Sequence, residues 1–270
     1  MDHGATPGKL LIIGGSEDRC CGSGLLERFV DLCGGDLARI ALITTASDEP
    51  EQVLAEYETV FRKLGVEHIT ELWCRGRADA DGDEAADLLA SATGVFFTGG
   101  DQSKLLTLVG SRFNKIIAHR LADGLVVGGT SAGATALGHT MILGGGGLDV
   151  AAAAVKTGPG LGLVPKVLID MHFAERNRQA RLLSAVANDP DHLGLGLDEN
   201  TGVLVQNGGF EVLGTAVATV VDAEGATVVH ATGERDPITL FGVRLHLLPA
   251  GCLFDFATRK PSIGPAHGGY

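Results

Sequence analysis

The sequence predicts an α/β protein, a three-layer sandwich whose mostly parallel central sheet has helices on both faces, with antiparallel hairpins added near the carboxyl end. Two observations support this fold class. Up to about residue 130, short apolar runs alternate with segments of helical periodicity, the pattern of βαβ units. Beyond residue 200, short β runs are separated by turn residues. The 270 residues, 45% of them hydrophobic, suffice for a large core without any break in composition, so we expect a single domain over 1–270.

The first half of the chain alternates between predicted strands and helices. Strands are predicted at Lys9–Ile13, Arg39–Thr44, Val66–Trp73, Gly94–Phe97 and Leu125–Val127. Helices are predicted at Leu25–Leu32, Glu51–Leu64 and Glu84–Ala90, with one or two more within Leu105–Leu121.

The second half changes character. A strand at Leu168–Asp170 and a helix near Arg178–Ala187 precede five β runs, at Thr201–Gln206, Phe210–Leu213, Ala216–Val221, Thr227–Val229 and Ile238–Leu248. The turn residues Asn207-Gly208-Gly209 between the first two runs predict an antiparallel hairpin.

Charge and composition exclude several classes of function. With 33 acidic and 21 basic residues the formal net charge is −12, which disfavours nucleic acid and anionic membranes as partners. The chain has no 18-residue apolar run and no secretory signal, so we expect a cytoplasmic protein. Five cysteines without a CxxC pair predict neither a disulfide framework nor a metal site. The segment GGSEDR after the first strand is not a nucleotide-binding loop, so no cofactor is expected.

The most informative segment is GLVVGGTSAGATALG, at residues 124–138. Its Gly-Thr-Ser-Ala-Gly matches G-x-S-x-G, the nucleophile elbow, in which a serine occupies a strained turn between a strand and a helix. The apolar run before Ser131 and the helical pattern after it are the context that this motif requires. A βα turn made of small residues for close packing is the alternative interpretation.

A serine nucleophile requires a general base, and the base requires an orienting carboxylate. His172 follows an apolar run and so lies at the carboxyl end of a predicted strand, where functional loops gather in parallel sheets. His139 is nearer in sequence, but the helical pattern places it at the far end of the elbow helix. For the acid, Asp149 lies between Ser131 and His172 in the chain and is our prediction. The rival acids are Asp170, Glu175, Asp198 and Glu199.

Two further segments predict oxyanion and substrate contacts. Thr98-Gly99-Gly100-Asp101-Gln102 follows a strand, and the N–H of Gly100 or Asp101 could complete an oxyanion hole with the N–H of Ala132. Asp101-Gln102 could instead cap the next helix. The three arginines Arg176, Arg178 and Arg181, just past His172, favour recognition of a carboxylate.

Together the segments FFTGGDQ, GGTSAGA, IDMHF, ERNRQARLL and GLGLDENT resemble the cyanophycinases, a serine-peptidase family that also contains peptidase E. The resemblance runs from about Lys9 to the carboxyl-terminal strands. It implies a fold like that of class I glutamine amidotransferases, a homodimer, and no metal or organic cofactor. It also implies an exopeptidase that hydrolyses cyanophycin, a poly-aspartate with arginine on each β-carboxyl, to β-Asp-Arg dipeptides.

By the same resemblance, Ser131 is the nucleophile and His172 the base, and the third member of the triad falls on the segment of Asp149. The substrate pocket corresponds to Gln102, Asp170, Arg176, Arg178 and Arg181. Asp170 could bind the guanidinium of the substrate, and the arginines its carboxylates.

One difference from the family leaves a second enzymatic activity as an alternative. The family has Gln where this chain has Met171, so an aspartyl or isoaspartyl dipeptidase acting on short peptides is the alternative. A non-catalytic binding protein would carry a broken triad. An unrelated α/β-hydrolase would place its histidine last in the chain, and no such histidine stands out here.

Overall fold

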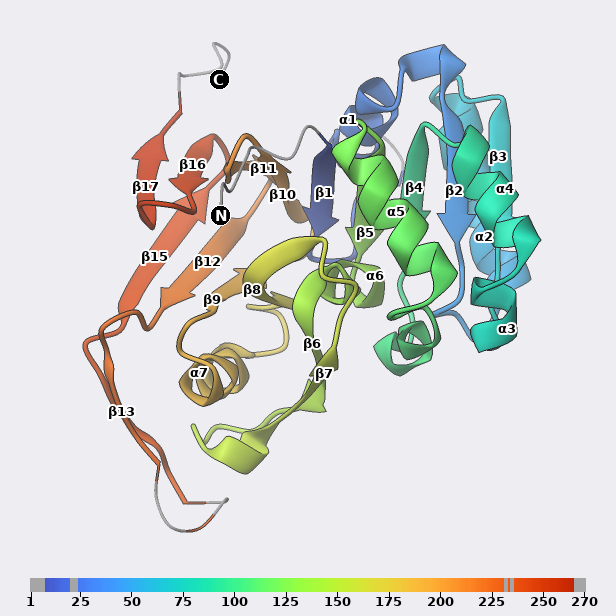
Figure 1. The fold of residues 1–270 in the computed structure, drawn as a ribbon. Helices are drawn as coiled ribbons and strands as arrows, with labels where there is room; N and C mark the ends of the chain where they lie inside the picture. Colours follow the sequence, from blue (N-terminus) through green and yellow to red (C-terminus); the bar gives the residue numbers. More distant parts are fainter. Residues whose placement is uncertain (1–7, 20–23, 231–232, 234–235, 265–270) are drawn as a thin grey trace.

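The structure is a computed structural model that describes residues 8–19, 24–230, 233 and 236–264. Its main framework is a nine-stranded sheet (Figure 1). In spatial order the strands are β17 (Lys260–Ile263), β16 (Cys252–Asp255), β11 (Gly209–Gly214), β10 (Thr201–Gln206), β1 (Lys9–Ile13), β5 (Val126–Thr130), β4 (Gly94–Phe97), β2 (Arg39–Ile43) and β3 (His68–Leu72). The five strands from β1 to β3 in this order are parallel, and the other four pair antiparallel.

Helices cover both faces of the parallel part. Leu11 and Ile13 of β1 point into a core shared with α1 (Leu25–Leu32) and α2 (Pro50–Lys63). The alternate residues Leu10 and Ile12 point to the opposite face. That face is packed by α3 (Arg77–Ala80), α4 (Asp83–Ser91) and α5 (Arg112–Ala122). The predicted α/β class, with its mostly parallel sheet between helical layers, is confirmed.

A second sheet of six strands carries the rest of the chain (Figure 1). Its spatial order is β15 (Arg244–Pro249), β12 (Val217–Asp222), β9 (Leu193–Leu197), β8 (Val164–Met171), β6 (Gly138–Gly145) and β7 (Val155–Pro159). The strands β6, β8 and β9 are parallel, and α7 (Gln179–Asn188) packs on one face. A two-stranded ribbon, β13 (Thr227–Val229) and β14 (Thr239–Phe241), extends from it.

Three short 3-10 segments complete the description. They are η1 (Gly35–Leu37), η2 (Gln102–Thr107) and η3 (Ala152–Ala154). The predicted hairpin is present, since β10 and β11 pair antiparallel around Asn207 and Gly208, both with positive φ. This is the conformation that a type I′ turn requires.

The strand β9 was not predicted because its sequence, LGLGL, hides an alternating pattern. Its leucines face the main core, whereas a Cβ on Gly194 or Gly196 would meet Val186 at 2.7 Å or the Phe173 ring at 2.5 Å. Glycine therefore brings α7 and the segment after β8 close to the sheet. The glycine-rich β6 was also missed, along with β7, β16 and β17. The expectation that His139 ends a helix is wrong, because it lies on β6 with its ring stacked on His192.

Phe96 of β4 centres an aromatic cluster, with ring centroids 5.1 Å from Phe29, 5.3 Å from Tyr57 and 5.8 Å from Phe61. We expect Phe96→Ala to lower the free energy of unfolding by about 3–5 kcal/mol, because a fully buried ring is removed. Urea unfolding measures this. The control Phe241→Ala removes a ring that is 59% exposed and should change stability by less than about 0.5 kcal/mol. Equal losses would contradict the assignment of Phe96 to the core.

Candidate active site

Ser131 lies between β5 and α6 (Ala132–Ala136), in the turn that the elbow motif predicts. Its φ of 50° and ψ of −116° are strained for a residue with a side chain. The two motif glycines permit this turn. A Cβ on Gly129 would lie 2.8 Å from the Gly133 carbonyl oxygen, and a Cβ on Gly133 would overlap the Phe97 carbonyl. The turn presents the hydroxyl on the side of β8.

His172 follows β8 directly and is 7% exposed. Its Nε2 lies 2.9 Å from Ser131 Oγ, and its Nδ1 lies 2.6 Å from Glu199 Oε1. Glu199 sits on the connection from β9 to β10, which leads from the six-stranded sheet to the nine-stranded one. A hydroxyl, an imidazole and a carboxylate are thus joined in the order that a serine triad requires.

The hydrogen bond with His172 lowers the pKa of Glu199, and the Ser16 hydroxyl and the nearby Arg176 charge act in the same direction against partial desolvation. Glu199 therefore stays ionised to lower pH than an ordinary glutamate. An ionised carboxylate on Nδ1 fixes the tautomer that leaves Nε2 free to accept the serine proton.

The structure does not place Asp149 in this arrangement. Asp149 is exposed in the loop between β6 and β7, and within the described residues the carboxylate on His172 Nδ1 belongs to Glu199. Position along the chain misled the prediction. Because β8 and β9 are parallel and Met171 pairs with Leu197, the residues that follow the two strands emerge side by side. The rival Asp198 instead accepts hydrogen bonds from the Ala174 and Val217 N–H groups, and burial raises its pKa.

Gly99, Gly100 and Ala132 lie on the side of Ser131 where the sequence predicts the oxyanion hole. A Cβ on Gly99 would lie 3.5 Å from Ser131 Cβ, so the glycine loop runs beside the nucleophile. The Asp101 N–H is already donated to the Ala46 carbonyl at 2.8 Å, which removes it from the predicted pair. The N–H groups of Gly100 and Ala132 donate to no acceptor in the part of the chain that the structure describes. Asp101 instead caps η2 through the Ser103 N–H.

The loop after β1 was not predicted to belong to the site, yet its backbone contacts the histidine and Asn200, the residue after Glu199. The Gly14 carbonyl accepts the His172 N–H at 2.8 Å, and the Gly15 carbonyl accepts the Asn200 N–H at 2.9 Å. Gly15 has φ of 110°, and a Cβ there would overlap the His172 ring. The only signal in the sequence is the pair of glycines at the carboxyl end of a strand.

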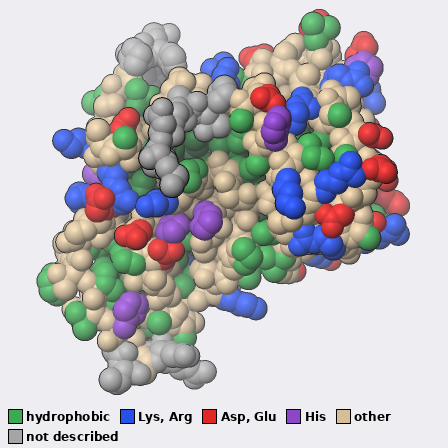
Figure 2. All heavy atoms as spheres, in the orientation of Figure 1, with side chains coloured by type: hydrophobic (Ala, Val, Ile, Leu, Met, Phe, Trp, Pro, Cys, Tyr) green, Lys and Arg blue, Asp and Glu red, His purple; other side chains and the backbone are tan. Residues whose placement is uncertain are grey.

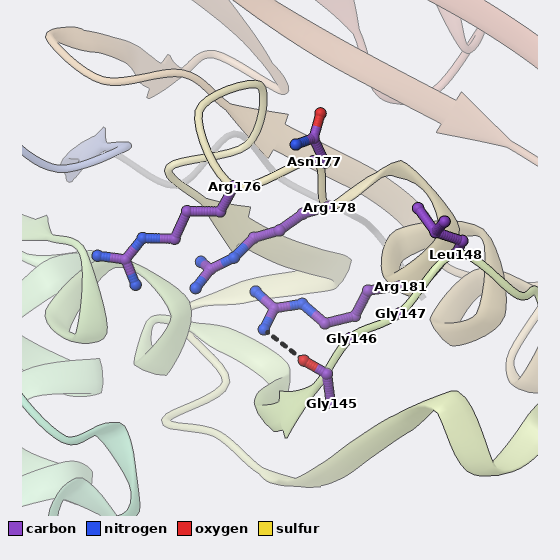
Figure 3. Close-up of a pocket in the computed structure, with 8 residues that line it drawn as sticks. All are labelled: Gly145, Gly146, Gly147, Leu148, Arg176, Asn177, Arg178 and Arg181. Atoms are coloured by element: carbon purple, nitrogen blue, oxygen red, sulfur yellow. Dashed lines mark hydrogen bonds between the residues drawn. The ribbon is translucent and has the colours of Figure 1, made fainter.

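A pocket of about 330 Å³ adjoins the segment after His172. It is lined by Gly145–Leu148, Arg176, Asn177, Arg178 and Arg181, and Figure 3 shows the three arginine side chains side by side, with Asn177 directed away from them. Burial and the neighbouring Arg181 charge lower the pKa of Arg178 to about 10. The pocket therefore concentrates positive charge and suits an anionic group.

From the sequence, Asp170 was expected to bind a guanidinium of the substrate. In the structure its carboxylate is instead paired with Arg178 and Arg181 of the protein itself. It is 0% exposed, and Arg181 grips both of its carboxylate oxygens while Arg178 Nη1 lies 3.4 Å away. Arg181 also donates to the Gly145 carbonyl, and Arg178 to the Met171 carbonyl. The Arg176 side chain is exposed and has no hydrogen bond to the described residues. It is the arginine available to a ligand.

The predicted pocket residue Gln102, and Met171 at the position where the family has Gln, both make contacts within the protein. Gln102 donates to the Ile142 and Leu143 carbonyls of β6 and so joins the glycine loop to the six-stranded sheet. Met171 is 3% exposed, with its sulfur 3.2 Å from Arg178 Nη1. Met171 thus acts on the pocket through Arg178 and does not line it.

Comparison with known proteins identifies the family. The sequence profile of peptidase family S51 matches residues 10–213. The chain belongs to peptidase family S51. It is similar to the cyanophycinase of Geminocystis herdmanii, with 38% identity over 261 residues that cover 94% of this chain and 96% of that protein. It is 39% identical to the cyanophycinase of Trichormus variabilis over 94% of this chain and 88% of that one.

A solved structure shares the fold. A peptidase from an acI-B1 actinobacterium superimposes with a TM-score of 0.64 at 21% identity, covering 87% of this chain and 97% of that one. The predicted S51 membership is confirmed, and with it the prediction of a serine-type peptidase.

On the face drawn in Figure 2, basic and acidic side chains of this S51 protein are interspersed over the helix-covered part. No helix among the described residues is long and apolar enough to cross a bilayer.

Replacing Glu199 by Gln should lower kcat/KM by about 10²- to 10⁴-fold, because a neutral amide neither fixes the His172 tautomer nor stabilises the imidazolium. Steady-state kinetics measure the loss. The control Asp149→Asn, in the exposed loop, should keep the activity of the wild type, and a loss there would restore Asp149 as the acid.

Proposed function

We propose that this S51 peptidase cleaves the poly-aspartate backbone of cyanophycin to β-Asp-Arg dipeptides, with Ser131 as nucleophile, His172 as base and Glu199 as the orienting acid. The observation that carries the proposal is the chain of contacts from Ser131 Oγ through His172 to Glu199, at 2.9 Å and 2.6 Å. The names of the curated relatives support the substrate. They favour the polymer over the short peptides of the alternative, an aspartyl dipeptidase.

In the first step His172 Nε2 accepts the Ser131 proton as Oγ attacks the scissile carbonyl of the substrate backbone. The charge that develops on the carbonyl oxygen is met by the free N–H groups of Ala132 and Gly100. The imidazolium is stabilised by Glu199 and then protonates the departing amine. Water, deprotonated by His172, releases the acyl group and restores the serine.

The arginine pocket gives this machinery a means of holding the substrate. Each unit of the polymer carries an arginine with a free carboxylate, and the pocket keeps two positive charges after Asp170 offsets one of three. Arg176 would pair with this carboxylate, while Arg178 and Arg181, held by Asp170, supply a fixed positive field. The homodimer and the cytoplasmic location expected from the sequence remain predictions.

Ser131→Ala should abolish the release of β-Asp-Arg from insoluble cyanophycin granules, because the variant lacks the hydroxyl that forms the acyl-enzyme. Granule clearing by wild type and variant, run side by side with mass detection of the dipeptide, tests this. Thermal unfolding should show the variant folded, since Ala also fits the turn. Clearing by the variant would overturn the nucleophile, and failure of the folded wild type to clear would overturn the substrate.

Arg176→Met keeps the length of the side chain and removes its charge, so KM for the polymer should rise about tenfold with kcat little changed, as expected when a charge-assisted contact to the bound substrate is lost. Arg62→Met, on α2 at the outer face of the nine-stranded sheet, is the matched control. A substrate with amidated arginine carboxylates should erase the difference between Arg176→Met and wild type. A persistent difference on that substrate would show that Arg176 does not bind the carboxylate.

A further inference from the structure

Glu17, on the loop after β1, is a buried acid that the proposed mechanism does not use. Its side chain is 1% exposed. Oε1 accepts a hydrogen bond from the Tyr57 hydroxyl at 2.5 Å, and Oε2 accepts one from the Thr130 hydroxyl at 2.5 Å. Arg19 Nε lies 3.5 Å from Oε1, with the guanidinium 4.6 Å above the Tyr57 ring.

A carboxylate without access to water destabilises a fold unless donors and a positive charge compensate for its lost hydration. Here two hydroxyls and Arg19 do so. The same compensation constrains the partners, because moving either hydroxyl away leaves a buried oxygen unsatisfied. The carboxylate therefore holds Thr130 of β5 and Tyr57 of α2 at fixed positions relative to the loop after β1.

The loop after β1, which carries Glu17, also contacts residues of the active site. Thr130 is the last residue of β5 and immediately precedes Ser131. Glu17 lies two and three residues after Gly15 and Gly14, whose carbonyls hold Asn200 and His172. The Asp18 N–H donates to the Asn200 side chain at 2.9 Å, and Ser16 contributes to the lowered pKa of Glu199. The Ser131 N–H is donated to the Ile13 carbonyl at the start of the loop. One segment thus contacts the nucleophile, the base and Asn200, the residue next to the acid.

We infer that Glu17, acting through Thr130, is a positioning residue that sets the distance between Ser131 and the His172–Glu199 pair. The inference rests on the proposed function, in which Ser131 is the nucleophile. The bond from Thr130 ties the strand that carries the serine to the loop that carries the backbone contacts of the histidine. Misplacement of reacting groups by about 1 Å is enough to slow catalysis by roughly 10²-fold.

A purely structural role would give a different result. Glu17 could serve only to stabilise the packing of β1, β5 and α2, and its loss would then lower the unfolding temperature without changing the rate of the folded enzyme. Thr44 provides a matched comparison. It is 0% exposed, it also donates a 2.5 Å hydrogen bond to a glutamate, Glu71, and it follows β2 near the edge strand β3.

The experiment compares Thr130→Val, Thr130→Ser and Thr44→Val with wild type. Two rates are measured on protein shown to be folded by circular dichroism at the assay temperature. The first is kcat and KM on cyanophycin. The second is the rate at which phenylmethylsulfonyl fluoride labels Ser131, located by peptide mass analysis. The labelling reads the nucleophile and its base without requiring the polymer or the arginine pocket.

We expect Thr130→Val to lower kcat and the labelling rate together, by roughly 10- to 100-fold, with KM unchanged. Thr130→Ser keeps the hydroxyl and should restore most of both rates. Thr44→Val should lose stability but keep both rates. Glu17→Gln leaves one acceptor oxygen for the two hydroxyls and should repeat the effect of Thr130→Val. The double variant Glu17→Gln/Thr130→Val should have rates no lower than either single variant, because both changes act on the same Glu17–Thr130 hydrogen bond.

Wild-type labelling rates in folded Thr130→Val and Glu17→Gln would overturn the inference, and so would equal losses in Thr44→Val. If Thr130→Val does not fold, Glu17→Gln and Thr130→Ser decide the matter by the same two rates. A wild type that is not labelled at Ser131 would overturn the proposed function, and this inference with it. A wild type that is labelled but does not clear granules would overturn the substrate alone.

Discussion

The site depends on one constraint, namely that a single imidazole must reach groups that belong to two different sheets. Ser131 comes from β5 in the nine-stranded sheet, and His172 follows β8 in the six-stranded sheet. Glu199 lies on the segment that connects them. The sheets must therefore dock closely before the triad exists. Gly14 and Gly15 after β1 permit that docking, because a Cβ on Gly14 would overlap the Asp198 carbonyl and a Cβ on Gly15 the His172 ring. Packing and catalysis share the same small residues.

The arginine pocket likewise depends on one buried residue, Asp170. Three guanidinium groups placed together repel each other and lose hydration, and Asp170 offsets both costs from beneath the pocket. Arg178 and Arg181 share Asp170 as their partner, so its removal would leave both guanidinium groups without a compensating negative charge. The pocket is thus cationic before any ligand arrives, although the chain as a whole carries a formal charge of −12. Local geometry, and not net charge, decides what this surface attracts.

The sequence predicted the parts of the site that short-range rules govern. A strand, a glycine-flanked serine and a helix suffice to recognise the elbow, and a histidine at the end of an apolar run is placed correctly by the topology of parallel sheets. Glu199 required the pairing of β8 with β9, which is a long-range fact, and LGLGL does not resemble a buried strand. Asp149 was preferred because it lies between the other two in the chain, but order along the chain does not fix position in space.

The sequence also failed to predict which polar groups near the site already have hydrogen-bond partners within the protein. Asp170, Gln102 and Asp101 were correctly placed near the site, yet each is satisfied by the protein itself, through Arg181, the β6 carbonyls and the η2 cap respectively. A sequence shows which polar groups are close but not which of them are already paired. Arg176, Gly100 and Ala132 keep unpaired donors among the described residues, and these are the groups with hydrogen bonds left to give. Because a donor without a partner in the protein gains most from a ligand that supplies one, the proposed roles in substrate binding and oxyanion stabilisation belong to these groups.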